Sequence, residues 1–174
     1  MPIRPQPGPQ EQFLSTSADI AIYGGAAGGG KTFAELMEPL RHIHNPGFGA
    51  VIFRKSYPQI FNEGALWDEA YELYPACGAS PRVSASQWIW PTGATVSLRH
   101  LGSDEELPGW GGSQIPLIMF DELCEFSERQ FWFMFSRNRS TCGVRPYMRG
   151  TCNPDPDSFV AKLISWWIGK DGYA

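Results

Sequence analysis

Short apolar runs alternate with amphipathic stretches along this chain, a pattern typical of strands connected by helices. Buried strands are predicted over 20–23, 50–54, 117–120 and 147–152. Helices are predicted over 33–42, 127–137 and 159–168, with two further helical pieces in 58–74 separated at Gly64. Because strands and helices follow one another in turn, we expect an α/β fold with a mostly parallel central sheet and helices on both faces.

Two segments between residues 87 and 112 break this alternation. Residues 87–90 and 95–101 carry aromatic and β-branched side chains on either side of the turn at 91–93, which predicts a β-hairpin inserted at an edge of the sheet. Residues 102–112 are polar and rich in glycine. We expect a mobile loop there, with Trp110 as its aromatic anchor.

The start of the chain has a different character. Four prolines stand between residues 2 and 9, which favours an extended arm over a helix. We therefore divide the chain into an N-terminal arm over 1–18 and one domain over 19–174. With 174 residues, 43% of them apolar, that domain can bury a sizeable core.

Composition and charge exclude several classes of protein. With a net charge of -4, no large basic surface dominates the chain, so any contact with DNA should be local or shared among subunits. The four cysteines lack metal-type spacing and are expected to be reduced thiols. The first residues lack the apolar core of a signal peptide, and no run approaches the roughly 20 apolar residues that cross a bilayer. We expect a soluble intracellular protein.

The break after the first strand carries the most specific chemistry. Gly25, Gly30, Lys31 and Thr32 satisfy the pattern G-x-x-x-x-G-K-[ST], in which backbone N–H groups surround the phosphates of a nucleoside triphosphate. Lys31 would neutralise the outer phosphates, and the Thr32 hydroxyl would ligate Mg²⁺. The predicted phosphate-binding residues are Gly25, Ala26, Ala27, Gly28, Gly29, Gly30, Lys31, Thr32 and Phe33.

Two acids follow the apolar run at 117–120. A buried strand would carry Asp121 and Glu122 to the carboxyl edge of the sheet, where open α/β sheets bind their ligands. We predict that Asp121 holds Mg²⁺ and that Glu122 polarises the attacking water, since the neighbouring carboxylate is committed to the metal. Together with Lys31 these residues predict a Mg²⁺-dependent ATPase that hydrolyses a phosphoanhydride bond.

With both phosphate motifs in view, the chain resembles the ATPase domain of the large terminase subunit of tailed bacteriophages. The resemblance extends to the segments 10–14, 53–57, 136–139 and 151–154. It implies a P-loop fold of the RecA-like type, with an additional strand and a catalytic glutamate. It also makes Asn153 the coupling residue that senses the terminal phosphate. Gln10 or Gln12 would read the adenine, with Phe13 packing nearby.

The sequence also departs from that family. Many members carry a basic residue inside the phosphate loop, where this chain has Ala26 and Ala27. We therefore expect an arginine from a neighbouring subunit to reach the transition state, because an arginine contributes orders of magnitude to the rate of phosphoryl transfer. The candidates are Arg99, Arg137 and Arg139.

The resemblance implies that ATP hydrolysis powers the translocation of double-stranded viral DNA into a procapsid. The partners would be the DNA, a portal protein, a small terminase subunit and copies of the chain in a ring. No membrane partner is expected. The protein would act in the cytoplasm of the infected bacterium and would be absent from the mature virion. Two alternatives stay open: a RecA- or helicase-like DNA repair ATPase, and a nucleotide-gated assembly module with little turnover.

Large terminases also carry a nuclease domain, and we expect this chain to be the motor domain without it. On that reading Asp155 and Asp157 are turn and helix-cap residues rather than metal ligands of a nuclease.

Overall fold

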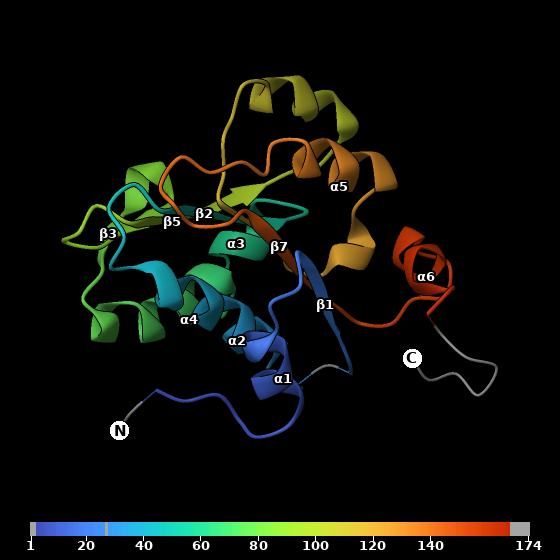
Figure 1. Cartoon of the computed structure of the whole chain (residues 1–174), viewed down its shortest axis with the longest axis horizontal. Coiled ribbons are helices and arrows are strands. Elements are labelled where there is room, and N and C mark those ends of the chain that lie inside the picture. The colour runs from blue at the N-terminus through green and yellow to red at the C-terminus, as the bar shows by residue number, and fades with distance from the viewer. Residues whose placement is uncertain (1–2, 27, 168–174) are drawn as a thin grey trace.

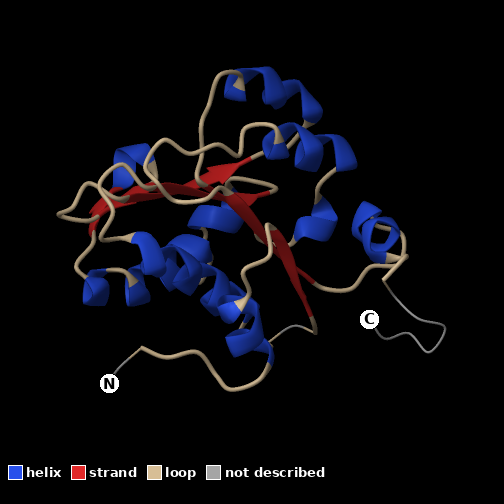
Figure 2. Cartoon of the chain, viewed as in Figure 1, coloured by secondary structure: helices blue, strands red, loops and turns tan. Residues whose placement is uncertain are grey.

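A seven-stranded sheet organises the chain, and helices cover both of its faces (Figures 1 and 2). The computed structural model describes residues 3–26 and 28–167. In their order across the sheet the strands are β1 (Ile20–Gly24), β7 (Tyr147–Cys152), β6 (Leu117–Phe120), β2 (Gly49–Arg54), β5 (Thr95–His100), β4 (Gln87–Ile89) and β3 (Ser80–Arg82). The first five strands run parallel to one another. Strand β4 pairs antiparallel with β5, and β3 pairs antiparallel with β4. The predicted α/β class, parallel sheet and hairpin are confirmed.

One strand, β7, lies between β1 and β6. The strand that leads into the glycine loop is therefore separated from the strand that leads to the two acids. This is the additional-strand arrangement expected of a RecA-like P-loop fold. It brings the end of β7 between the two motifs.

Alternating side chains of the central strands build two cores, as the period of a strand requires. On one face, Ile52 and Met119 pack with Leu36 and Trp67 from the helices. On the other face, residues of β2 and β6 such as Phe53 and Phe120 pack with Phe131. Because both faces are buried, the strands read as continuous apolar runs in the sequence.

The helices are α1 (Pro9–Ser15), α2 (Lys31–Met37), α3 (Pro58–Phe61), α4 (Leu66–Leu73), α5 (Glu128–Phe135) and α6 (Phe159–Ile164). The predicted break at Gly64 is present, where φ is +72°. A 3₁₀ turn over 38–42 follows α2, because Pro39 cannot donate the next helical hydrogen bond. Ser127 caps α5 and accepts a hydrogen bond from the Gln130 N–H.

Several sequence-based boundaries differ from the structure. The arm was expected to be extended over 1–18, but Pro9–Ser15 forms α1, since proline is tolerated in the first turn of a helix. Helix α5 ends at Phe135 rather than at 137, and α6 ends at Ile164. The predicted last residue of α6, Ile168, lies outside the described residues.

The segment 102–112 is also not the mobile loop that we expected. Residues Asp104–Trp110 form a 3₁₀ helix, and Glu106 accepts hydrogen bonds from the Gly102 and Ser103 N–H groups at 3.0 and 3.1 Å. The expected anchor is confirmed: Trp110 packs edge-on against Phe53, with ring centroids 4.9 Å apart. In the described part of the chain, no helix is long and apolar enough to span a membrane.

Candidate nucleotide-binding site

The glycine loop leaves the sheet at the carboxyl end of β1, beside the end of β7. Gly24 is paired with Cys152 in the sheet, and the Gly25 N–H donates to the Cys152 carbonyl at 3.2 Å. Gly30 has φ +67°, in the left-handed region where glycine has no steric cost. Of the predicted phosphate-binding residues, Ala27 lies outside the described residues. Phe33 is exposed in the first turn of α2.

Lys31 is buried and turned back onto the loop. Its Nζ donates to the carbonyls of Gly25 and Ala26, both at 2.8 Å, and to Asn153 Oδ1 at 3.0 Å. All three donors of the ammonium group are thus satisfied by the protein. A triphosphate in the loop would take over these donors.

Asn153 connects the lysine to Glu122. Its Oδ1 accepts from Lys31, and its Nδ2 and backbone N–H donate to the two Glu122 carboxylate oxygens, each at 3.2 Å. The amide therefore has its acceptor towards the cation and its donor towards the anion. Lys31, Glu122 and Asn153 come from separate segments, and all three were predicted as site residues from the sequence. The hydrogen bonds of Asn153 bring them together.

The backbone of Glu122 adopts an unusual conformation. Its φ and ψ are 59° and 56°, so the residue lies in the left-handed region, which L-residues with a Cβ rarely occupy. The Glu122 N–H points to Thr151 Oγ1 at 3.3 Å. This local reversal turns the Glu122 side chain towards Asn153, whereas Asp121 stays in the sheet.

Asp121 is held on both sides. Its backbone N–H donates to the Phe53 carbonyl at 3.0 Å, which continues the pairing of β6 with β2. Its Oδ1 accepts from Thr151 Oγ1 at 2.8 Å, and its Oδ2 lies 3.1 Å from Arg54 Nε. Burial raises the pKa of Asp121, and the Arg54 charge opposes that effect.

Thr151 joins this carboxylate to the helix that follows the loop. Its Oγ1 also lies 3.2 Å from the Glu35 carboxylate on α2. A hydroxyl has a single proton, so Thr151 can donate to only one of the two carboxylates at a time, and its contact with Asp121 is the shorter one. Complete burial raises the pKa of Glu35 well above its usual value, which agrees with a neutral acid at this position.

The sequence did not identify Arg54, Glu35 or Thr151 as site residues. Arg54 and Thr151 stand in segments that carried the family resemblance, so the sequence marked these segments but gave neither residue a role. Glu35 looked like an ordinary polar position of an amphipathic helix. Only the contact between α2 and β7 shows that it faces the site.

Gln10 and Gln12 differ in position. Gln10 is buried, donates from Nε2 to the Gly30 carbonyl at 2.8 Å, and accepts from the Gln6 N–H at 2.8 Å. Gln12 is exposed. Phe13 packs against Tyr23, with ring centroids 5.4 Å apart. The structure therefore brings Gln10, and not Gln12, to the phosphate loop, and adenine recognition by either residue stays a prediction.

The candidate arginines lie away from the phosphate loop of their own chain. The Arg137 carbonyl accepts from Ile115, just before β6, and Asn138 bonds the Ile115 and Tyr147 carbonyls. Arg137 and the exposed Arg139 are thus at the amino edge of the sheet, opposite Asp121. Arg99 bonds the Ala85 and Ser86 carbonyls next to the hairpin.

The donor chemistry around the loop fits Mg²⁺ bound together with a nucleotide. A Thr32 hydroxyl and an Asp121 carboxylate are hard oxygen ligands of the kind that Mg²⁺ prefers. Among residues 3–26 and 28–167, no group of three or more His, Cys, Asp and Glu side chains could hold a metal ion by itself. The protein would thus provide part of the coordination shell, and phosphate oxygens and water the rest.

Beyond the coupling segment, Asp155 is a turn residue, as predicted: its Oδ1 accepts from the Asp157 N–H at 2.9 Å. The cap of α6 is Ser158 rather than Asp157, because the Ser158 side chain accepts from the Ala161 N–H.

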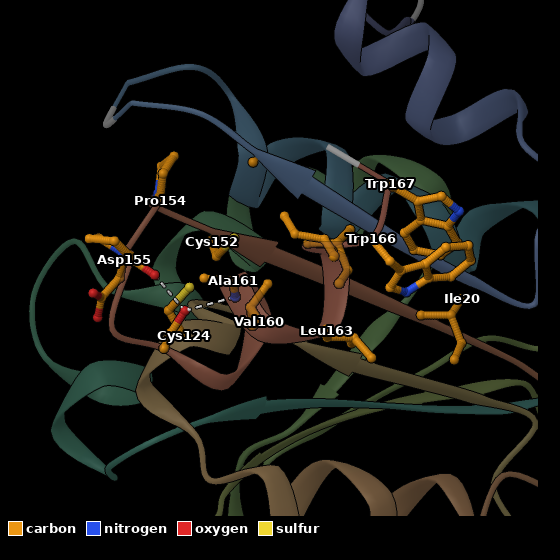
Figure 3. Close-up of a pocket in the computed structure, with 15 residues that line it drawn as sticks. Ile20, Cys124, Cys152, Pro154, Asp155, Val160, Ala161, Leu163, Trp166 and Trp167 are labelled. Carbon is orange, nitrogen blue, oxygen red and sulfur yellow. Dashed lines mark hydrogen bonds between the residues drawn. The ribbon is translucent and has the colours of Figure 1, made fainter. Parts of the chain in front are cut away.

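A cavity of about 650 Å³ lies next to the site but is distinct from it (Figure 3). Its walls come from β1, the end of β7 and α6, and include Cys124, Cys152 and the closely packed pair Trp166 and Trp167. The lining is almost entirely apolar and contains neither Lys31 nor Thr32. The lining of this cavity therefore does not suit a charged triphosphate.

Comparison with known proteins agrees with this fold. Among solved structures, the chain is similar to the large terminase of bacteriophage HK97 (14% identity, TM-score 0.69), covering 94% of this chain and 36% of that one. It is similar to the large terminase ATPase domain of Thermus phage P74-26 (15% identity, TM-score 0.63), with 97% and 72% covered. A third is the large terminase of a thermophilic bacteriophage in complex with ADP (16% identity, TM-score 0.60), with 84% and 39% covered.

At these identities the solved structures establish the fold alone, and the chain spans about a third of the HK97 protein. No curated protein sequence matches. The profile of the family described as "Terminase large subunit, T4likevirus-type, N-terminal" matches residues 22–173, which include the phosphate loop, the acidic pair and Asn153. The chain therefore belongs to the family of T4likevirus-type large terminase subunits, as their N-terminal part.

Proposed function

We propose that this chain binds Mg²⁺-ATP in the loop 25–32 and hydrolyses it. The observation that carries this proposal is the hydrogen-bonded chain from Lys31 through Asn153 to Glu122. A phosphate-binding cation, a polar sensor and a potential base meet at one edge of the sheet. The solved structures with the same fold include a named ATPase domain and a complex with ADP, which supports the same activity here.

Each residue has a role in this mechanism. Lys31 leaves the loop carbonyls and neutralises the outer phosphates, and Glu122 orients and polarises the attacking water. Mg²⁺, held by Thr32 and Asp121, would neutralise further phosphate charge when it is bound. Arg54 and Thr151 keep Asp121 in place.

Asn153 couples the state of the site to the rest of the fold. Once a phosphate draws Lys31 away, Asn153 Oδ1 loses its partner, and the bonds from Asn153 to Glu122 are free to rearrange. Asn153 follows β7 and precedes the turn into α6, so a change there is passed to both elements. A hydrogen bond that depends on the ligand is the kind of contact that biases a two-state element.

We further propose that hydrolysis drives packaging of double-stranded viral DNA, in line with membership of the large terminase family. The partners would be a portal protein, a small terminase subunit and further copies of the chain in a ring. The site of action would be the cytoplasm of the infected bacterium. The acidic net charge supports DNA contacts that are shared among subunits.

The test compares nucleotide binding with turnover. K31A should lose binding of a fluorescent ATP analogue, and E122Q should keep binding but lose hydrolysis. The exposed lysine of α6 provides a matched control, so K162A should behave as wild type. Unchanged nucleotide affinity in K31A would refute the site. Binding without turnover in wild-type protein assembled on its portal would instead favour a nucleotide-gated assembly module.

A further inference from the structure

Arg54 is the last residue of β2 and lies beside Asp121. The register of the two parallel strands pairs Phe53 with Phe120, and the Asp121 N–H continues this pairing to the Phe53 carbonyl. The neighbouring residue, Lys55, is directed elsewhere and bonds Gln130 Oε1 at 3.0 Å. The sheet therefore sets Arg54, and not the lysine, against the metal-binding carboxylate.

The contact between the two side chains is close and shielded. Arg54 Nε lies 3.1 Å from Asp121 Oδ2, and the side chains are 19% and 2% exposed. The Thr151 hydroxyl occupies the other carboxylate oxygen at 2.8 Å. Arg54 Nε and Asp121 Oδ2 form a close ion pair without a hydrogen bond, so Oδ2 is held by charge and Oδ1 by the Thr151 hydrogen bond. Together these two contacts favour one orientation of the carboxylate about its Cβ–Cγ bond.

We propose that Arg54 is a positioning residue for metal binding: it fixes the orientation of the Asp121 carboxylate and balances its buried charge, so that Mg²⁺ meets a preformed ligand. This inference rests on the proposed function, because the metal arrives with the nucleotide. Arg54 acts through Asp121 and not on the phosphates.

Two effects of removing Arg54 oppose each other. Loss of a positive charge close to the metal site would by itself tighten cation binding. Loss of Arg54 leaves a carboxylate on a side chain that is 2% exposed without its cationic partner, and breaking one side of a buried ion pair is costly. Because Asp121 is so deeply buried, we infer that the second effect is the larger one.

The experiment measures metal affinity separately from nucleotide affinity. Mn²⁺ binding to the protein loaded with adenylyl imidodiphosphate is followed by electron paramagnetic resonance, and affinity for the nucleotide is measured in EDTA. R54Q should weaken Mn²⁺ binding at least tenfold while nucleotide affinity in EDTA changes less than twofold. R54K should lie between R54Q and wild type, since it keeps the charge and loses the planar guanidinium group.

The control variant is R129Q. Arg129 is an exposed arginine, with its side chain 75% exposed and 3.9 Å from Asp104, and its loss should leave both affinities unchanged. Mn²⁺ affinity of R54Q within twofold of wild type, or tighter, would overturn the inference. A parallel fall of nucleotide affinity in EDTA would also overturn it, since that result indicates a general structural role.

A double variant keeps the test valid if R54Q alone does not fold. D121N/R54Q contains no unpaired buried charge, and its Mn²⁺ affinity should equal that of D121N, because Arg54 has no carboxylate left to position. A tenfold difference between the two would show that Arg54 acts on the metal or phosphates directly. Absence of nucleotide binding in wild-type protein would instead contradict the proposed function, so the two failures are distinguishable.

Discussion

The left-handed backbone of Glu122 conflicts with the conformational preference of a residue with a Cβ. A non-glycine residue in this region costs about 1–2 kcal/mol relative to its ordinary conformation. We expect E122G to be about 1 kcal/mol more stable than E122A in chemical unfolding, since both lose the carboxylate and only glycine relieves the strain. Both should lack turnover. Equal stability of the two variants would show that the conformation is not strained.

Glu35 leads to a prediction about pH. Its pKa is raised above the usual 4.5, so the folded protein holds a proton that the unfolded chain releases. Stability from this group is therefore complete below pH 4.5 and decreases as pH rises towards the raised pKa. E35Q cannot ionise, so its unfolding free energy should gain on that of wild type as the pH rises above 4.5. A difference independent of pH would contradict a neutral Glu35.

Helix α1 contacts the phosphate loop through the hydrogen bond from Gln10 to the Gly30 carbonyl. A Cβ at Gly30 would overlap Gln10 Nε2, so the helix and the loop are in direct contact. Q10A should leave the Gly30 carbonyl unpaired, increase hydrogen exchange in the loop and lower nucleotide affinity several-fold. Gln114 is an exposed glutamine outside the site, so Q114A is the matched control and should change neither property. Equal effects of the two substitutions would exclude this clamp.

The strands and most helices were predictable because buried parallel strands are continuous apolar runs and helices repeat at their own period. The 3₁₀ helix at 104–110 was missed although Ser103 and Glu106 form the Ser-x-x-Glu capping signal. Strand β3 gave no signal, since all three of its residues are exposed. The network around Asp121 could not be predicted from the sequence. Arg54 and Glu35 lie near Asp121 only because β2 and β7 flank β6 and because α2 packs against β7.

Arg137 and Arg139 lie at the amino ends of the parallel strands, whereas the phosphate loop lies at their carboxyl ends. We therefore expect Arg137 or Arg139 to act in catalysis only at the site of a neighbouring chain. We expect specific ATPase activity to rise with protein concentration. R137A/R139A should reduce the turnover of assembled protein by a factor of about 10³ without changing nucleotide affinity.

The control for this prediction is R145A, a third arginine near these amino ends, which pairs with Asp19 at 2.8 Å. Its turnover should stay close to that of wild type. A specific activity independent of concentration, with full turnover in R137A/R139A, would show that another group completes the site.

The three hydrogen bonds of Lys31 have a kinetic consequence. A nucleotide has to displace existing hydrogen bonds when it binds, because the ammonium group must first leave the two loop carbonyls and Asn153. In stopped-flow mixing, the observed binding rate should level off at high ATP concentration, at the rate at which the lysine disengages. N153A removes one of the three hydrogen bonds of Lys31 and should raise this limiting rate. Asn153 would then also influence how soon each subunit can bind its next ATP.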